Sequence, residues 1–302
     1  MATTPSHLAG LSVEISGLAN RAAPSLVAIE HKRRSISGFY WRPDVIATVS
    51  EGLEAQPGEA VAVRTGAGET VQGTVIGDDP STDLVLIRVP GPGATLPAAA
   101  VAAVALGQAV VAVGRTLQGA TAALGFVALA GGPWRSMRGG EISQRVWLDA
   151  RVMRAAEGGA VIDTAGGLLG MAVFGPRHRV LLVPVDTIER AGTELLAHGR
   201  IRHGYLGVSV QAVPLPAAGP DEAKDRSIGL MVMGLDAKGP AAAAGMLRGD
   251  IITGVDGVAP SSPRALARLL PASAIGQSKP VDLVRAGQTT HLSVTIGEHP
   301  DQ

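Results

Sequence analysis

The chain has 302 residues, of which 46% are apolar and only 3% aromatic, and its 26 basic residues are balanced by 26 acidic ones. The balanced charge gives no net field that would recruit nucleic acid or an anionic membrane, and the complete lack of cysteine excludes a disulfide framework, thiol catalysis and cysteine zinc sites. The length suffices for about two domains, and 40 glycines and 20 prolines without a repeating period indicate many turns between short strands.

Residues 1–21 form the first predicted element, a weakly amphipathic helix and arm with apolar positions at Leu8, Leu11, Val13 and Leu18. This segment has no basic region followed by an apolar core, and no apolar run in the chain reaches transmembrane length without charges or turn signals. The sequence therefore predicts no membrane span. It predicts a cytoplasmic protein as written, or a periplasmic or other envelope protein if a leader was removed.

Short apolar runs separated by turns follow, first in residues 25–89 and then in residues 108–185. Their spacing is typical of antiparallel β-strands. A connection rich in proline and glycine, residues 90–97, divides the two sets. With about six strands in each set, residues 22–190 are predicted to form two small β-barrels side by side.

Residues 186–204 are predicted as a linker helix followed by a short polar connection. We expect Asp186 to cap the helix and Glu189 to complete a capping box, while Gly199 supplies the C-terminal stop. The domain boundary is placed in this polar connection.

The remaining residues, 205–298, are predicted to form a smaller mixed unit of strands and helices. Ser262 and Pro263 open one of its helices, because serine caps helix N-termini and proline is favoured in the first turn. The leucines of that helix share one side, at Leu266, Leu269 and Leu270.

This order of elements resembles the HtrA/Deg family, whose members have a trypsin-like protease part followed by a C-terminal PDZ domain. The strongest match is PAAAAGMLRGDIITGVDG at 240–257, with RALARLL following at 264–270. The resemblance covers residues 22–298. It implies a mostly β fold, with a trypsin-like double β-barrel over 22–190 and a mixed α+β PDZ domain over 205–298.

The resemblance also implies where a catalytic triad would lie. DPSTDLVLIRV at 79–89 is similar to the family's acidic-residue strand and makes Asp83 the triad aspartate. The family's histidine follows an I-x-T-x-x pattern, and at that position this chain has Glu51. The general base is therefore replaced by a carboxylate.

DARVMRAAEGG at 149–159 has the length of the family's nucleophile loop, without a gap. Glu157 stands where the family has serine, and Ala155 replaces the glycine that helps to shape the oxyanion hole. Serine hydrolysis needs a hydroxyl activated by an adjacent base and amides that bind the oxyanion. We therefore predict a pseudoprotease without an intact catalytic residue. The alternative is an HtrA-type serine endopeptidase with a non-standard catalytic arrangement.

If the triad geometry is retained, Glu51, Asp83 and Glu157 bring three carboxylates close together. Such a group raises at least one pKa or attracts a positive charge. One alternative is a bound cation such as calcium or magnesium. The other is that Glu157 faces solvent or pairs with a nearby arginine, for which the candidates are Arg42, Arg154 and Arg115. No residue is assigned as a metal ligand, and no cofactor is expected.

The second half of the chain resembles a working PDZ domain. Such a domain binds an extended C-terminal peptide as an added strand, and loop amides hold the carboxylate. The resemblance implies a peptide-binding set of Tyr205, Leu206, Gly207, Val208, Ser209, Val210, Leu266 and Leu270. The same residues could instead be only the core of a small domain. The partners expected are C-terminal or unfolded segments of proteins.

Members of the family often trimerise through an N-terminal segment that bears an aromatic residue. Residues 1–30 of this chain contain no aromatic residue, so the sequence leaves open whether it forms a trimer.

Overall fold

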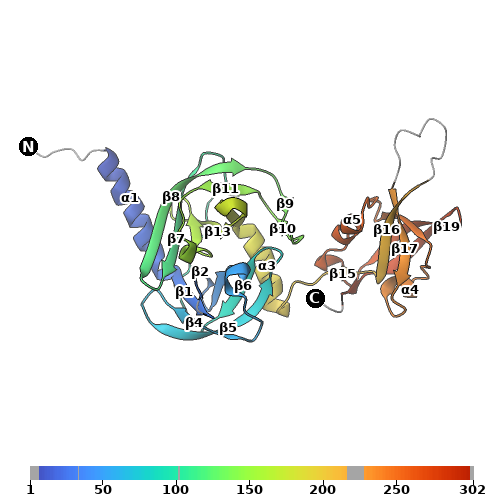
Figure 1. The fold of residues 1–302 in the computed structure, drawn as a ribbon, viewed down its shortest axis with the longest axis horizontal. Helices are drawn as coiled ribbons and strands as arrows, with labels where there is room; N and C mark the ends of the chain where they lie inside the picture. The colour runs from blue at the N-terminus through green and yellow to red at the C-terminus, as the bar shows by residue number, and fades with distance from the viewer. Residues whose placement is uncertain (1–6, 33, 101–102, 216–227, 300–302) are drawn as a thin grey trace, which may run out of the picture. The chain divides into compact units, whose positions relative to one another are not determined.

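The structure is a computed structural model, shown in Figure 1, and it describes residues 7–32, 34–100, 103–215 and 228–299. Residues 1–6 of the predicted arm and residues 216–227 of the predicted PDZ domain lie outside the described residues. The chain divides into two compact units, Met1–Arg200 and Ile201–Gln302. Within the described part of the chain, no helix has the length and apolar character needed to cross a membrane.

The first unit contains the two predicted barrels, each closed and antiparallel. The strands of the first barrel are β1 (Leu26–His31), β2 (Arg34–Arg42), β3 (Val45–Thr48), β4 (Ala60–Arg64), β5 (Thr70–Asp79) and β6 (Leu84–Arg88), hydrogen-bonded in the order β1-β2-β3-β6-β5-β4. Those of the second are β7 (Ala109–Thr116), β8 (Gly119–Ala130), β11 (Val146–Asp149), β12 (Ala160–Ile162), β13 (Leu168–Phe174) and β14 (Val180–Pro184). Their order is β11-β14-β13-β12-β7-β8. The prediction of two barrels is confirmed.

Each barrel is filled by side chains that point inward. In the first barrel Leu26, Ile29, Phe39 and Ile46 are fully buried. Burying one such side chain contributes roughly 1.5–3 kcal/mol. Because closure pairs the first strand with the last, neither barrel leaves a free edge for another chain.

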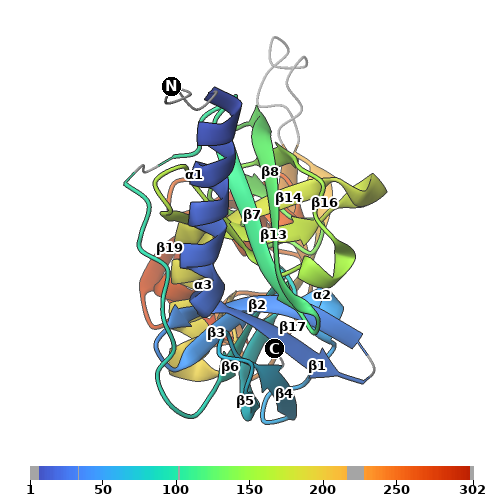
Figure 2. The same cartoon turned by 90° about the vertical axis from the view of Figure 1, so that its left-hand side faces the viewer.

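Helix α1 (His7–Ala22) precedes the barrels and contacts β7 and β8, as Figure 2 shows. Its last turns are packed, with Leu18 and Ala22 buried, but Leu8 is 78% exposed and Val13 is 71% exposed. Leu11 is also exposed. The predicted helix is therefore present, and of its four apolar positions Leu18 alone is buried, since residues 7–14 are exposed throughout.

Helix α3 (Val185–His198) follows β14 directly, and its predicted start is wrong. Pro184 is the N-cap, no side chain caps the helix, and Asp186 lies inside the first turn. Instead of completing a capping box, Glu189 accepts hydrogen bonds from Trp41 Nε1 at 2.7 Å and from Arg42 Nη2 at 2.5 Å. The predicted stop is confirmed, because Gly199 adopts a left-handed φ of 70°.

Since α3 contacts β5, β6 and β13, it belongs to the first unit.

The second unit is a five-stranded antiparallel sheet in chain order, composed of β16 (Val208–Pro214), β17 (Ile228–Leu235), β18 (Ile251–Val255), β19 (Ser278–Arg285) and β20 (Gln288–Thr295). Two short strands, β15 (Gly204–Tyr205) and β21 (Gly297–Glu298), pair separately. The helices are α4 (Pro240–Ala243) and α5 (Pro263–Arg268). The predicted cap of α5 is confirmed, because Ser262 Oγ accepts the Ala265 N–H at 3.1 Å.

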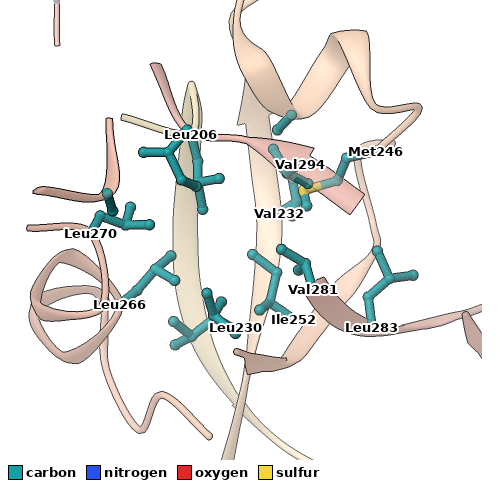
Figure 3. Packing of buried hydrophobic residues seen from close by; sticks show 14 residues of the cluster. Leu206, Leu230, Val232, Met246, Ile252, Leu266, Leu270, Val281, Leu283 and Val294 are labelled. Carbon is teal, nitrogen blue, oxygen red and sulfur yellow. The ribbon is translucent and has the colours of Figure 1, made fainter. Parts of the chain in front are cut away.

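The core of the second unit lies between the sheet and α5. Figure 3 shows Leu266 and Leu270 on one side of the cluster, next to Leu230, and Val232 farther across it, beside Met246 and Val294. At its border the buried Asp250 accepts two hydrogen bonds from Arg285, each 2.8 Å long. The Arg285 guanidinium therefore holds the pKa of the Asp250 carboxyl below its usual value.

Candidate functional site

A cleft of about 670 Å³ lies where the two barrels meet. The first barrel contributes the start of β2 and the short helix α2 (Ser50–Leu53). The second barrel contributes the one-turn helix η2 (Arg154–Ala156) and the residues that follow β13. Glu51 and Glu157 both line this cleft.

Asp83 lies in the turn between β5 and β6 and has a left-handed φ of 61°. Its carboxylate accepts the Glu51 N–H at 2.9 Å, and its main-chain carbonyl accepts the Ser50 N–H at 3.4 Å. Burial raises the pKa of Asp83 from 3.8 to about 6, the Glu51 amide opposes this shift, and the carboxylates of Glu157 and Glu51 add to it. The carboxylates of Glu51, Asp83 and Glu157 thus act on one another, as the resemblance implied.

Glu157 is half-buried at the end of η2. Its Oε1 accepts the Phe174 N–H at 3.0 Å, and its main-chain carbonyl accepts the Ser37 N–H at 2.8 Å. Burial raises the pKa of Glu157, the Phe174 amide and the Arg154 charge lower it, and Glu51 raises it. The carboxyl group is therefore held against β13 and does not extend freely into solvent.

Of the three arginines considered as partners of Glu157, only Arg154 acts on it electrostatically. Arg42 pairs with Glu189, and Arg115 donates to the carbonyls of Leu26 and Gly66 at 3.1 Å each. Within the described residues, no group of three or more His, Cys, Asp or Glu side chains could hold a metal ion. The described residues therefore contain no set of three such side chains that could bind the calcium or magnesium ion considered above.

In η2 the amide of Glu157, which an oxyanion hole would need as a donor, already donates a hydrogen bond within the main chain. The Glu157 N–H donates to the Arg154 carbonyl at 3.2 Å, and the Ala156 N–H donates to the Met153 carbonyl at 2.8 Å. An amide that already donates within the chain does not point at a substrate oxygen. Gly158, which follows, has a φ of 84°, and a Cβ there would lie 2.3 Å from the Ser37 carbonyl oxygen. This contact between the barrels requires glycine whether or not the loop catalyses a reaction.

The predicted peptide site of the second unit lies on β16 and α5, which are in contact. β16 is the edge strand of the sheet, as peptide addition requires. Gly207 has a φ of 78°, and a Cβ there would lie 3.1 Å from the Gly239 Cα. The carbonyls of Leu206 and Gly207 accept the Ala241 and Asp236 amides at 2.8 Å each. Among the described residues, no hydrogen bond uses the Leu206 or Gly207 amide as donor.

The side chains expected to wall the peptide pocket are buried in the domain core. Leu206, Leu266 and Leu270 are 2%, 4% and 5% exposed. Val208 and Val210 are half-buried, Ser209 is exposed, and the Tyr205 hydroxyl donates to Asp236 Oδ2 at 3.3 Å. A peptide side chain would therefore have to enter between β16 and α5.

A second pocket, of about 440 Å³, was not predicted from the sequence. It lies beside Glu51 and is lined by the hairpin of β9 (Trp134–Arg135) and β10 (Glu141–Ile142) and by the end of β13. The only sequence feature that marks it is the Trp134 and Met137 pair in a glycine-rich hairpin, in a chain with few aromatic residues.

These features define a trypsin-like double β-barrel followed by a PDZ domain. Residues 36–171 match the family described as a trypsin-like peptidase domain, and residues 204–296 match the PDZ domain family. The crystal structure of a serine endoprotease from Yersinia pestis has a TM-score of 0.72 at 23% identity, covering 94% of this chain and 98% of that one. The HtrA-type protease AlgW with decapeptide gives a TM-score of 0.71 at 21% identity, covering 95% of this chain and 99% of that one.

The sequence relatives of the chain include serine endoproteases. A probable periplasmic serine endoprotease, DegP-like, from Brucella suis is 30% identical over 276 residues, which cover 88% of this chain and 53% of the relative. The serine endoprotease DegS from Haemophilus influenzae is 23% identical over 165 residues, covering 51% of this chain and 48% of the relative. The chain thus spans about half the length of the curated relatives that it matches.

Proposed function

We propose that this chain is an HtrA-like pseudoprotease, which binds peptide segments of other proteins and does not hydrolyse them. The observation that carries the proposal is the state of the η2 loop, where Glu157 occupies the position expected for the nucleophile and its amide donates to the Arg154 carbonyl. A carboxylate held by the Phe174 amide has no hydroxyl to attack a peptide carbonyl.

The size of the expected defect follows from the behaviour of serine proteases in general. When even one triad member is removed, the oxyanion hole and substrate binding alone leave a residual catalysis of roughly 10³–10⁴-fold over water. Here the base position at Glu51 and the nucleophile position at Glu157 are both carboxylates, and one oxyanion amide is engaged, so the nucleophile, its base and part of the oxyanion hole are missing. The proposed role of the barrels is therefore binding.

The test is casein cleavage together with fluorophosphonate labelling of the full chain. The proposal predicts neither cleavage nor a labelled serine. Labelling at any serine would overturn it, because fluorophosphonates react with activated serine hydroxyls.

The second unit is proposed to bind C-terminal segments along β16, with the Leu206 and Gly207 amides holding the terminal carboxylate. Support comes from the free edge of β16 and from the unused amides of this loop in the described structure. Titration with peptides that end in an apolar residue tests the idea. Binding that disappears when the peptide is amidated at its C-terminus is expected, and equal binding of both forms would contradict it.

A second candidate function is an HtrA-type serine endopeptidase with a non-standard catalytic arrangement. It is favoured by the names of the relatives, which are serine endoproteases. The same names favour a periplasmic or other envelope location, and they give no support to the cytoplasmic expectation. Fractionation of the source cells tests the location, and the fluorophosphonate experiment separates the two functions.

A further inference from the structure

The 440 Å³ pocket is lined by apolar residues together with two acidic ones. Its apolar lining includes Trp134, Ile142, Phe174, Pro176 and Leu181. Met137, at the turn of the hairpin, also lines it and is 87% exposed. Such a surface is suited to an aliphatic or aromatic side chain, because burial of apolar area is favourable.

Asp83 and Glu51 are the two acidic residues among those that line this pocket. Glu51, Phe174 and Gly175 also line the 670 Å³ cleft, so the pocket and the cleft share a boundary at these three residues. Among the described residues, no Lys, Arg or His side chain lies within 4.0 Å of Asp83 or Glu51 as an ion-pair partner. The pocket therefore pairs an apolar surface with negative charge that the chain itself does not neutralise.

The arginines around the pocket interact with groups other than Asp83 and Glu51, or line the neighbouring cleft. Arg138 lines the pocket but donates to the Pro80 carbonyl at 3.4 Å, and its charge acts on Asp78. Arg154 and Arg177 line the neighbouring cleft, where Arg154 acts on Glu157. Among the described residues none of these cations forms an ion pair with Asp83 or Glu51, so a cation that pairs with them must come from outside.

We propose that this pocket binds an extended peptide segment in which an aliphatic or aromatic side chain stands next to a lysine or arginine. The apolar side chain lies against Trp134 and Phe174, and the cationic group lies between Asp83 and Glu51. Charge-assisted hydrogen bonds in a partly desolvated site are stronger than those in water. The inference rests on the proposed function, because it requires a segment that is held without being cleaved.

The proposal predicts that binding weakens as the pH falls through about 6, the value to which burial raises the pKa of Asp83. The groups that face this carboxyl are the Glu51 and Ser50 amides and the carboxylates of Glu51 and Glu157. Protonation of Asp83 removes its charge, so the cationic side chain loses its attraction while the apolar contact remains.

The experiment measures fluorescence anisotropy of labelled peptides on the full chain. All peptides are amidated at the C-terminus, which removes the carboxylate that the second unit would hold. A leucine–lysine core is compared with leucine–norleucine, leucine–glutamate and serine–lysine cores in the same glycine and serine background. We expect the leucine–lysine peptide to bind about tenfold more tightly than the others at neutral pH.

Asp83→Asn is expected to remove the preference for lysine over norleucine, and Asp44→Asn, a matched change at an exposed aspartate paired with Arg88, is expected to keep it. Equal affinity for the lysine and norleucine peptides on the unmodified chain would overturn the inference, and so would an equal loss in both variants. If Asp83→Asn does not fold, the peptide series on the unmodified chain decides alone.

Mass spectrometry of the same samples separates this inference from the proposed function. Intact peptides that bind without preference for lysine contradict only the inference. Cleaved peptides contradict the proposed function.

Discussion

The carboxyl group of Asp83 is held in an environment that disfavours its charged form. Burial raises its pKa from 3.8 to about 6, so the folded chain binds this proton more tightly than the unfolded chain does. Stability from this group is therefore fully present below the unfolded value of 3.8 and is lost as the pH rises through about 6. At neutral pH the side chain opposes folding, as groups at functional sites often do.

Asp83→Asn should therefore stabilise the first unit at neutral pH. Asparagine tolerates the left-handed φ and can still accept the Glu51 N–H, while it carries no charge. The expected gain in the free energy of unfolding is at most about 3 kcal/mol at neutral pH and falls towards zero near pH ~4. Urea unfolding at several pH values measures it, with Asp44→Asn as the control. A gain that does not change with pH would contradict the assigned cause.

The triad positions make a second prediction at the residue scale. A triple variant, Glu51→His with Ala155→Gly and Glu157→Ser, should hydrolyse casein at a detectable rate, whereas the parent chain should show no hydrolysis. Only a trace is expected, because the residue 157 amide must first leave the Arg154 carbonyl. A fluorogenic casein assay checks the rate. A well-folded triple variant without any hydrolysis would contradict the assignment of these positions.

At the scale of elements, local sequence predicted one helix start and missed another. Ser262 caps α5 as expected, because serine followed by proline is typical of a helix N-terminus. Asp186 looked equally suitable, but β14 continues into α3 without a polar turn, and the helix already begins at Val185. Strand β2 shows another limit, since its six consecutive buried residues, 36–41, have no alternating pattern.

The contrast between these two helix starts can be measured. Ser262→Ala removes the hydrogen bond to the Ala265 amide and should lower the stability of the second unit by about 1 kcal/mol. Asp186→Ala removes no capping bond and should cost less than about 0.5 kcal/mol. Denaturant unfolding followed for each unit gives both values. A larger loss of unfolding free energy for Asp186→Ala than for Ser262→Ala would contradict the conclusion that Ser262 caps its helix and Asp186 does not.

The loop that precedes β16 gives a prediction about binding. Gly207→Ala places a Cβ on a residue with a φ of 78°, where it would lie 3.1 Å from the Gly239 Cα. The strain should move the Leu206 and Gly207 amides and weaken binding of C-terminal peptides by about tenfold. Calorimetric titration measures the affinity, and Gly257→Ala, a change at another positive φ with open space around it, serves as the control. Unchanged affinity in Gly207→Ala would argue against carboxylate capture by this loop.

At the scale of the whole molecule, the arrangement of strands could be predicted because turns and apolar runs are local features. The spacing of these runs predicted two small β-barrels and a following mixed unit of strands and helices. The convergence of Glu51, Asp83 and Glu157 depends on folding over about a hundred residues, and it was accessible only through the resemblance. The turn of η2 depends on main-chain hydrogen bonds, and no sequence pattern indicates it. The pocket at the β9–β10 hairpin depends on long-range packing, and the Trp134 and Met137 pair marks only the hairpin that lines it.

The central claim is that the chain holds unfolded segments and does not cut them. Reduced, unfolded casein is incubated with an excess of the full chain, the complex is isolated by size exclusion, and its components are analysed by intact mass spectrometry. The account predicts casein that co-elutes with the chain and keeps its full mass, with the chain carrying no acyl adduct. Casein fragments that accumulate in proportion to the concentration of the chain would contradict it.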